Sequence, residues 1–519
     1  MIPIGVSSLY TRLLTLIAMV SLVSAATTAD HTRFPILNKP LESVHQVTKA
    51  CLTCHTEAAN QIQHTKHWTW NGTDGRRDYG KINVLNNFCI GVPGNEPRCT
   101  SCHVGYGWKD ESFDFSAEEN VDCLVCHDQT GSYKKLPTGA GYPVSEDTNF
   151  KGTMFFKPDL NYIAQNVGLP TRENCGACHF EGGGGDAVKH GDLDGSLVEP
   201  SFNLDVHMAP TGADFSCTDC HTTTEHVISG SRYNPIARDL GGLDLPRRDT
   251  TSVTCISCHG DEPHVANTKL NDHTDDIACQ TCHIPTIARE RATKMWWDWS
   301  KAGQLDENGK PFKRYNEHGQ VIYDSQKGLF RWGLDIEPEY RWFNGDVKFL
   351  TLNDTLYTSN VVIINEIQGS PLDGKSKIWP FKVHRGKQPY DVENRTLVIP
   401  KLFGPKGSGA YWSDFNWDVA IRKGAQVNGQ NYSGSYDFIE TEMYWPINHM
   451  VAPASKALQC HECHSREGRL AGLAGCYLPG RDYFPLLDRV MWLALAAIIV
   501  GVLIHGMMRI YFMKMLDEK

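Results

Sequence analysis

Two apolar runs near the ends of the chain stand out against a body in which polar and apolar residues alternate over short distances. The first, Leu13 to Val23, spans 11 residues, follows one positive charge and precedes Ser24-Ala25-Ala26. This pattern predicts a secretory signal peptide over residues 1–26. An uncleaved anchor is the alternative, but a spanning helix needs about 20 apolar residues. We therefore expect the mature protein to lie outside the cytoplasm.

The second apolar run lies close to the C-terminus. The 19 residues from Val490 to Met508 contain no Asp, Glu, Lys or Arg, and at about 1.5 Å per residue they can cross a bilayer. Aromatic residues follow, as at a membrane interface. We predict a transmembrane helix over residues 490–512 and a cytoplasmic tail over 513–519. With an exported body, this places the protein on the periplasmic side of the inner membrane.

Residues 291–450 carry a third pattern, in which β-branched and aromatic residues are separated by frequent Gly, Asn and Pro. Tyr357 to Ile367 and Thr396 to Ile399 predict strands. The region holds nine of the 13 tryptophans. Such aromatics usually fill a core, and a substrate-docking role is the alternative. After this region, Ala454 to Ser465 predicts a helix.

Composition narrows the classes of protein that fit this pattern. The 519-residue chain has a formal net charge of -10, with 21% charged and 10% aromatic residues, which excludes a disordered chain and argues against a nucleic-acid binder. It contains 18 cysteines and 22 histidines, yet it is far too long to be a disulfide-stapled miniprotein. Metal or haem chemistry would use both residue types.

Sixteen of the 18 cysteines belong to one motif, Cys-x-x-Cys-His, which occurs eight times. Two thiols at this spacing add to the two vinyl groups of one haem, and the adjacent imidazole reaches the iron. Zinc also binds Cys-x-x-Cys pairs, but it gives no reason for a histidine after every pair, and a dithiol oxidoreductase would need only one motif. We predict eight covalent c-type haems. Their cysteines and proximal histidines are Cys51, Cys54 and His55; Cys99, Cys102 and His103; Cys123, Cys126 and His127; Cys175, Cys178 and His179; Cys217, Cys220 and His221; Cys255, Cys258 and His259; Cys279, Cys282 and His283; and Cys460, Cys463 and His464.

The spacing of the motifs predicts the fold of residues 27–290. The first seven motifs follow one another at intervals of about 38 residues, which is too little chain to build an apolar core around each haem. The haems must therefore form the core, wrapped by short helices and long loops. We predict a mainly α fold with this multihaem region, a haem-poor region with some β-structure over 291–450, and the eighth haem segment over 451–480.

Fourteen histidines outside the motifs are candidates for the second axial position of the irons. Methionine is the other common ligand, but several methionines lie in or beside the membrane helix, so bis-histidine haems are favoured. From their positions along the chain we predict seven distal ligands and keep two histidines in reserve. The seven are His67, His207, His226, His264, His273, His384 and His449, and the two are His45 and His190.

A haem enzyme of this kind needs one iron whose ligand a substrate can replace. One segment of the chain indicates which residue is that ligand. Gly182 to Gly185 precede Asp186, Lys189 and His190, and glycine permits close approach of the backbone to a macrocycle. A lysine amine binds iron only in its neutral form, and it is a replaceable ligand. A solvated lysine in a flexible loop is the alternative.

This segment, the eight motifs, Asn86-Asn87-Phe88-Cys89 and Asn448-His449-Met450-Val451 together resemble the octahaem tetrathionate reductase family over most of the mature chain. That family is related in haem arrangement to hydroxylamine oxidoreductase and pentahaem nitrite reductase. The resemblance implies that the haem at Cys99 and Cys102 is the active one, with Lys189 as its distal ligand and with Asp186, Asn86 and Cys89 lining the pocket. No motif reads Cys-x-x-Cys-Lys, so the proximal lysine typical of nitrite reductases is absent.

These expectations combine into a predicted function. Electrons would pass along the haems to the lysine-ligated haem, which would reduce tetrathionate, nitrite or hydroxylamine, with protons from Asp186, His190 or Lys189. The membrane helix predicts docking to a quinone-linked partner such as a cytochrome b. A non-catalytic electron carrier between the quinol pool and a terminal acceptor is the alternative. A structural or adhesive protein is disfavoured because it would have no use for the cofactors.

Two cysteines, Cys89 and Cys476, lie outside the motifs. In an oxidising periplasm they could form a disulfide. The family resemblance instead places Cys89 beside the active haem, and Cys476 lies about 14 residues before the membrane helix.

Overall fold

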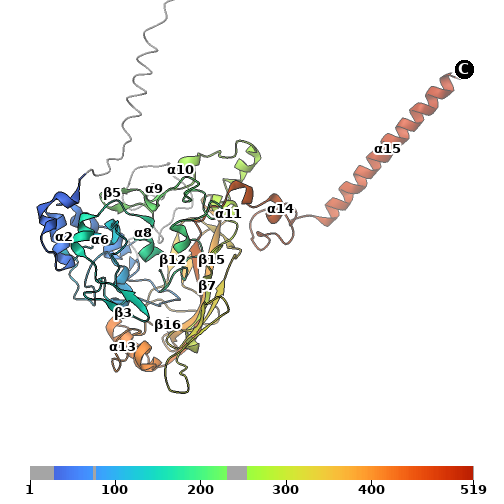
Figure 1. Ribbon diagram of the computed structural model, residues 1–519. Helices are drawn as coiled ribbons and strands as arrows, with labels where there is room; N and C mark the ends of the chain where they lie inside the picture. The colour runs from blue at the N-terminus through green and yellow to red at the C-terminus, as the bar shows by residue number, and fades with distance from the viewer. Residues whose placement is uncertain (1–28, 74–77, 231–253, 518–519) are drawn as a thin grey trace, which may run out of the picture.

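The computed structural model describes residues 29–73, 78–230 and 254–517, so the predicted signal peptide lies outside the described residues. Two kinds of structure follow one another along the chain (Figure 1). Short helices and long loops form the first part, and a large sheet follows from residue 293. This order confirms the predicted fold class, in which a loop-rich motif region precedes an aromatic-rich region with β-structure.

Every motif lies in or directly beside a short helical turn. The two cysteines and the histidine occupy positions i, i+3 and i+4, which share one face of a helix. Capping boxes begin three of these helices, at Thr171 with Asn174, at Ser216 with Asp219 and at Gln459 with Glu462. The motif helices are α2 (Val44–Leu52), α5 (Glu96–Cys99) with η4 (Thr100–Cys102), α6 (Leu124–His127), α8 (Arg172–His179), α9 (Cys217–Cys220), α10 (Ile256–His259), α11 (Cys279–His283) and α14 (Cys460–Cys463).

A nine-stranded sheet dominates the aromatic-rich region. Its longest strands, β15 (Lys377–Asp391) and β17 (Tyr436–Pro446), pair antiparallel from Phe381 opposite Pro446 to Asp391 opposite Tyr436. The strand order is β13-β17-β15-β7-β10-β9-β8, and β11 and β16 also pair with β15. The remaining bounds are β7 (Thr293–Asp298), β8 (Lys313–Tyr315), β9 (Val321–Asp324), β10 (Gly328–Gly333), β11 (Glu339–Phe343), β13 (Val362–Ile363) and β16 (Thr396–Leu397).

Aromatic side chains form the core between this sheet and the motif region. Trp297 and Trp299 are fully buried and Trp445 is 2% exposed, and all three pack in one cluster with Phe88 and Val188 from the motif region. This agrees with the expectation that the tryptophans fill a core. The same cluster attaches the sheet to the segments around residues 88 and 188.

Two local predictions need correction. The strand predicted over Tyr357 to Ile367 forms only in its second half, as β13 and β14 (Asn365–Ile367). The single helix predicted over Ala454 to Ser465 is wrong. A short turn at Ala454–Lys456 is separated from α14 by extended residues, because the Leu458 amide donates to the carbonyl of Cys282 in a tertiary contact.

The last helix, α15 (Pro485–Asp517), extends away from the rest of the protein (Figure 1). Its 33 residues have an apolar window with a mean hydropathy of 2.3, and none of that window is buried. By length and composition it can cross a membrane, and it contains the run predicted to do so.

Candidate haem cavity and active site

A continuous cavity of about 2670 Å³ lies among the motif helices and reaches Trp379 and Trp445 of the sheet. Pockets for ordinary small ligands are about 300–1,000 Å³, so this cavity has room for several macrocycles. Cysteines from seven of the eight motifs line it. The thiols and the space therefore fit a set of covalently attached haems.

Neighbouring cysteines from different motifs show how the motifs are ordered in space. The first, third, fourth, fifth, sixth, seventh and eighth motifs form one line, and the second motif is a branch beside the fourth. At each step, two cysteines lie close enough for one to shift the pKa of the other: Cys51 and Cys123, Cys126 and Cys175, Cys102 and Cys178, Cys175 and Cys217, Cys220 and Cys258, Cys255 and Cys279, and Cys282 and Cys463.

Seven of the eight motif histidines face a second imidazole. A metal bound by an imidazole on each side needs the ring centres about 6 Å apart, since each nitrogen lies about 2 Å from the metal and about 1 Å from its ring centre. The observed centroid separations are 6.0–6.4 Å. This spacing fits bis-histidine haems. The pairs are His55 with His31, His127 with His226, His179 with His67, His221 with His449, His259 with His207, His283 with His264, and His464 with His273.

Hydrogen bonds at Nδ1 leave Nε2 of several of these rings as the nitrogen that can bind a metal. His127 Nδ1 lies 2.8 Å from the Gly168 carbonyl, and His226 Nδ1 lies 2.7 Å from Gln61 Oε1. Such partners orient the ring and raise its basicity as a ligand. The same arrangement occurs at His221 with the Ser229 carbonyl, His264 with Asn271, and His449 with Asp192.

Six of the seven predicted distal histidines thus lie opposite a motif histidine, and His384 does not. His384 is fully buried in β15, with its ring against Phe88 and its Nδ1 2.9 Å from Asn87 Oδ1. The Asn87 amide in turn donates to the His384 carbonyl at 2.7 Å. In this structure His384 therefore lies opposite Asn87 and not opposite a motif histidine, so its predicted role as a distal ligand stays a prediction.

The structure instead places His31 opposite His55, a pairing that the sequence analysis missed. Its position 20 residues before the first motif was the available signal. Of the two reserve histidines, His45 has its ring nitrogens 3.0 Å from the Glu119 carbonyl and the Tyr142 hydroxyl. His190 lies edge-on to Trp445 at 5.2 Å.

His103, in the second motif, has a different environment. Its fully buried ring is enclosed by aromatic side chains, and its Nε2 lies 2.7 Å from the Trp68 carbonyl. Burial lowers the pKa of His103 to about 3, so the ring is neutral. The second motif therefore differs from the other seven, whose histidines each face an imidazole. The enclosing side chains are Trp68, Trp70, Trp108, Phe113 and Phe115.

Lys189 follows the glycine loop and lies against the sheet, with its Nζ 4.7 Å from the ring centre of Trp445. Gly183 and Gly184 have φ values of 81° and 92°, which favour glycine. A Cβ on Gly182 would lie 3.0 Å from Lys189 Cδ. The glycines therefore allow the loop to turn tightly against the lysine stem.

Two buried side chains of the sheet hold four successive carbonyls of this loop. The Lys382 ammonium donates to the carbonyls of Val188 and Lys189, at 3.0 and 2.9 Å, and to the Thr293 hydroxyl. That hydroxyl lies 2.6 Å from the Ala187 carbonyl and 2.9 Å from the His190 carbonyl. Both side chains are fully buried. We call this arrangement the Lys382 clamp.

The other residues predicted for the pocket surround this loop. Asn86, Cys89, Lys189 and His190 line the cavity, and Cys89 Sγ lies 3.6 Å from the Gly183 carbonyl. Asn86 Oδ1 accepts the Cys89 amide at 2.8 Å and so holds its turn. Asp186 is turned away, with its carboxylate bound to Arg291 and the Gly195 amide, both at 2.8 Å.

The two cysteines outside the motifs are free thiols in separate places, so the disulfide alternative is wrong for this structure. Cys89 packs against the core cluster that contains Phe88 and Trp445. Cys476 packs instead with Leu470 and Leu478 near the last motif.

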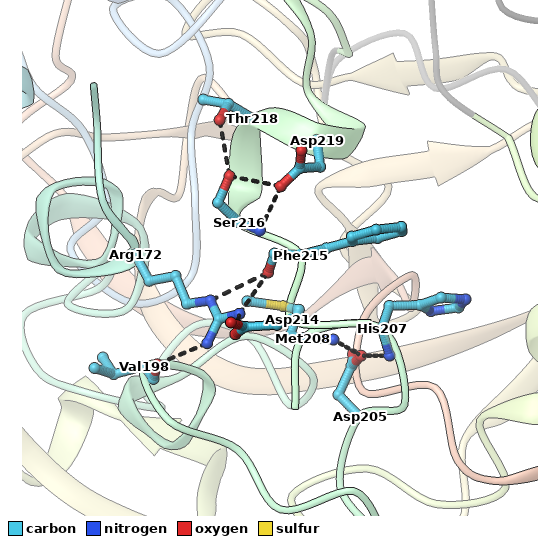
Figure 2. Close-up of polar contacts among 10 residues, drawn as sticks. All are labelled: Arg172, Val198, Asp205, His207, Met208, Asp214, Phe215, Ser216, Thr218 and Asp219. Atoms are coloured by element: carbon cyan, nitrogen blue, oxygen red, sulfur yellow. Dashed lines mark hydrogen bonds and ion pairs between the residues drawn. The ribbon is translucent and has the colours of Figure 1, made fainter. Parts of the chain in front are cut away.

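Carboxylates and an arginine order the loops around the fifth motif (Figure 2). Asp205 Oδ1 accepts the amides of His207 and Met208, each at 2.9 Å. Arg172 donates to the carbonyls of Val198 and Phe215, just before α9 begins. His207 and helix α9 are therefore held by separate hydrogen bonds.

The other oxygen of Asp205 accepts the amides of Met450 and Val451, at 2.9 and 3.2 Å. One buried carboxylate thus joins the loop that carries His207 to the segment that carries His449. Asp192 completes this connection, since its Oδ2 accepts the His449 amide at 3.0 Å and contacts its Nδ1 at 3.2 Å.

Similarity to known proteins agrees with this geometry. The family model described as "Cytochrome c554 and c-prime" matches residues 50–128, and the one described as "Cytochrome c bacterial" matches residues 294–467. The crystal structure of an octahaem cytochrome c from Shewanella oneidensis shares 43% identity with a TM-score of 0.75, over 85% of this chain and 95% of that chain. This chain belongs to the octahaem c-type cytochromes.

No curated protein matches this octahaem cytochrome. Membership of the family means that its cofactor is covalently attached haem c and that its chemistry is redox chemistry or electron transfer. The thiol pairs, the cavity and the facing imidazoles fit that cofactor.

Replacing His31 by Ala should remove one axial ligand from the haem of the first motif. We expect a new high-spin signal in the electron paramagnetic resonance spectrum, which added imidazole should remove. The matched control is His384→Ala, which should leave the low-spin signals unchanged because His384 faces Asn87. A high-spin signal in the His384 variant alone would contradict the pairing.

Replacing Lys382 by Met should release the loop around Lys189. Two carbonyls would lose their hydrogen-bond donor, which costs roughly 1–3 kcal/mol of local stability. We expect faster amide hydrogen exchange over residues 182–191, measured by mass spectrometry. Lys387→Met, on the same strand, is the control, and equal exchange in both variants would show that the clamp does not hold the loop.

Proposed function

We propose that this octahaem cytochrome is a membrane-anchored reductase that carries eight haems and reduces a small sulfur or nitrogen oxyanion or hydroxylamine at the haem of the second motif. The observation that carries the proposal is the difference between His103 and the other seven motif histidines, which each face an imidazole. A site without a second imidazole leaves a position for a replaceable ligand, and Lys189 is our choice for it.

The order of the motifs supports a direction for electron flow. When bound, the haems supply one-electron centres in a chain, one of them with an exchangeable ligand. The eighth motif precedes α15, and the line of motifs leads from it to the fourth. The second motif branches from the fourth, through Cys102 and Cys178. A branch that ends at the second motif suits a haem that passes electrons to a substrate.

Protein groups around the glycine loop would bind the substrate and supply protons. Cys89, Lys189 and His190 line the cavity there. Reduction of tetrathionate takes two electrons and breaks its central S–S bond to give two thiosulfate ions, without any proton. Nitrite and hydroxylamine require protons at nitrogen and oxygen, and His190 or Lys189 would deliver them. Asp186 is less suited to this role because Arg291 and Gly195 bind its carboxylate.

The C-terminal helix supports an anchored location on the periplasmic side of the inner membrane. The tether would hold the eighth motif close to the membrane, since α14 ends 22 residues before α15 begins. A quinone-linked membrane protein such as a cytochrome b would then supply electrons at this end.

A non-catalytic electron carrier is the second candidate, favoured by the seven facing imidazole pairs. In that case all irons should be low-spin and six-coordinate. Resonance spectra of the purified protein without any high-spin or substrate-responsive signal, and no turnover with reduced dye and tetrathionate, nitrite or hydroxylamine, would favour the carrier.

Replacing Lys189 by Ala should change the haem of the second motif. We expect its resonance signal to shift and dye-linked turnover to fall by about 100-fold, because both a ligand and a proton donor are lost. Lys157→Ala, an exposed lysine outside the cavity, is the control. An unchanged spectrum and turnover in Lys189→Ala would place the active haem elsewhere.

Ending the chain at Phe484 should release the protein from the membrane. Since no residue of α15 is buried, the truncated protein should fold and keep its dye-linked turnover. Electron transfer from quinol in membrane vesicles should be lost. Cell fractionation followed by haem staining measures the release, and a truncated protein that stays in the membrane fraction would disprove anchoring by α15.

A further inference from the structure

Cationic side chains converge where the haem cavity opens beside the glycine loop. Gly184 is exposed and lines the cavity. Arg98 Nη2 and Lys327 Nζ each lie 3.8 Å from the position that a Cβ on Gly184 would occupy. Two cations from distant parts of the chain therefore approach one point, and the lack of a side chain at Gly184 leaves that point open.

The surroundings of Lys327 are unusual for a lysine. Its Nζ lies 5.9 Å from the ring centre of Trp297 and 5.6 Å from that of Trp412. Burial lowers the pKa of Lys327, Cys89 and Asp324 oppose this shift, and the charges of Arg98 and Lys151 add to it. Like charges held together in a partly buried place repel one another. An anion between them would relieve that repulsion.

Two further groups belong to the same wall of the cavity. Lys151 lies at the tip of the hairpin formed by β3 (Thr148–Phe150) and β4 (Thr153–Phe155), with its Nζ 3.4 Å from Gln326 Oε1. The indole Nε1 of Trp412 is buried without a hydrogen-bond partner in the part of the chain that the structure describes. A buried donor of this kind normally has a partner.

The carboxylates near these cations do not neutralise them all. Asp324 lies 3.9 Å from Lys313 and accepts the Gln326 amide. Glu181, which also lines the cavity, is close enough for Arg98 to lower its pKa, but burial dominates and raises that pKa. The cavity lining beside the glycine loop is therefore cationic overall, with Arg98, Lys151 and Lys327 against Glu181.

We propose that Arg98 and Lys327, beside Gly184, form an anion-binding subsite that recognises the oxyanion groups of the substrate before it reaches the haem of the second motif. The inference rests on the proposed function and deepens it, because it assigns the substrate class as small inorganic anions. A sulfonate or nitrite oxygen would accept from the Arg98 guanidinium and the Lys327 ammonium. A neutral molecule such as hydroxylamine would gain little from them.

A haem carboxylate is the main competing partner for these cations. Arg98 directly precedes Cys99, so it would lie near the thioether edge of a haem held by the second motif. The propionates of a haem leave the opposite edge of the ring from the two vinyl carbons that the cysteines bind. Arg98 is therefore poorly placed to form an ion pair with the propionates of that haem.

The test compares Arg98→Gln and Lys327→Gln with Lys310→Gln, which removes an exposed lysine outside the cavity. Binding of thiosulfate to the oxidised, haem-loaded protein is measured by calorimetry and needs no turnover. We expect the Kd for thiosulfate and the KM for tetrathionate and nitrite to rise about tenfold in each cavity variant, as when a charged hydrogen bond is lost. The KM for hydroxylamine at pH 8, the haem content and the control should not change.

Three outcomes would overturn the subsite. An unchanged Kd with shifted haem potentials would show that the cations pair with propionates. An equal rise of the KM for hydroxylamine would show general damage, and an unchanged Kd and KM would show no role at all. Wild-type protein that binds thiosulfate with the expected dependence on Arg98 and Lys327 but has no turnover would refute the reductase function and leave the subsite standing.

Discussion

The facing imidazole rings impose the main constraint on this fold. Each pair takes one ring from a motif and the other from outside that motif, and in pairs such as His127 with His226 and His464 with His273 the two rings are far apart in the chain. No motif can therefore complete its own site, and several sites form only when distant segments meet. This explains the short helices and long loops, because loops allow the repeated crossings while each helix needs only one turn for its motif.

The sheet has a second role, which is to hold the candidate active site. Lys382 and His384 lie two residues apart on β15, so they share one face of the strand. Lys382 binds the loop that carries Lys189, and His384 binds Asn87 in the turn that leads to Cys89. Both sides of the pocket are therefore attached to one rigid strand, which suits a site whose geometry must not relax when a ligand leaves.

The branch at the second motif and the cations near Gly184 lie on two sides of the same candidate site. On the protein side, the line of motifs leads to it through the fourth motif. On the solvent side, Arg98 and Lys327 stand where the cavity opens. In the function that we propose, an anionic substrate and the electrons reach the second motif by separate routes, and α15 holds the other end of the line near the membrane.

The sequence by itself determined the local chemistry. Cys-x-x-Cys-His predicts attachment and the proximal ligand because all the reacting groups lie within one helical turn, and the apolar run at Val490 predicts α15 because a membrane selects on length and composition alone. Tertiary structure decided which histidine faces which motif, and so it placed His31 opposite His55 and buried His384 in a strand. It also decided that Asp186 binds Arg291 and that Lys382 holds the Lys189 loop. These contacts join residues that are 19 to 297 positions apart in the chain, well beyond the few residues over which a local pattern acts.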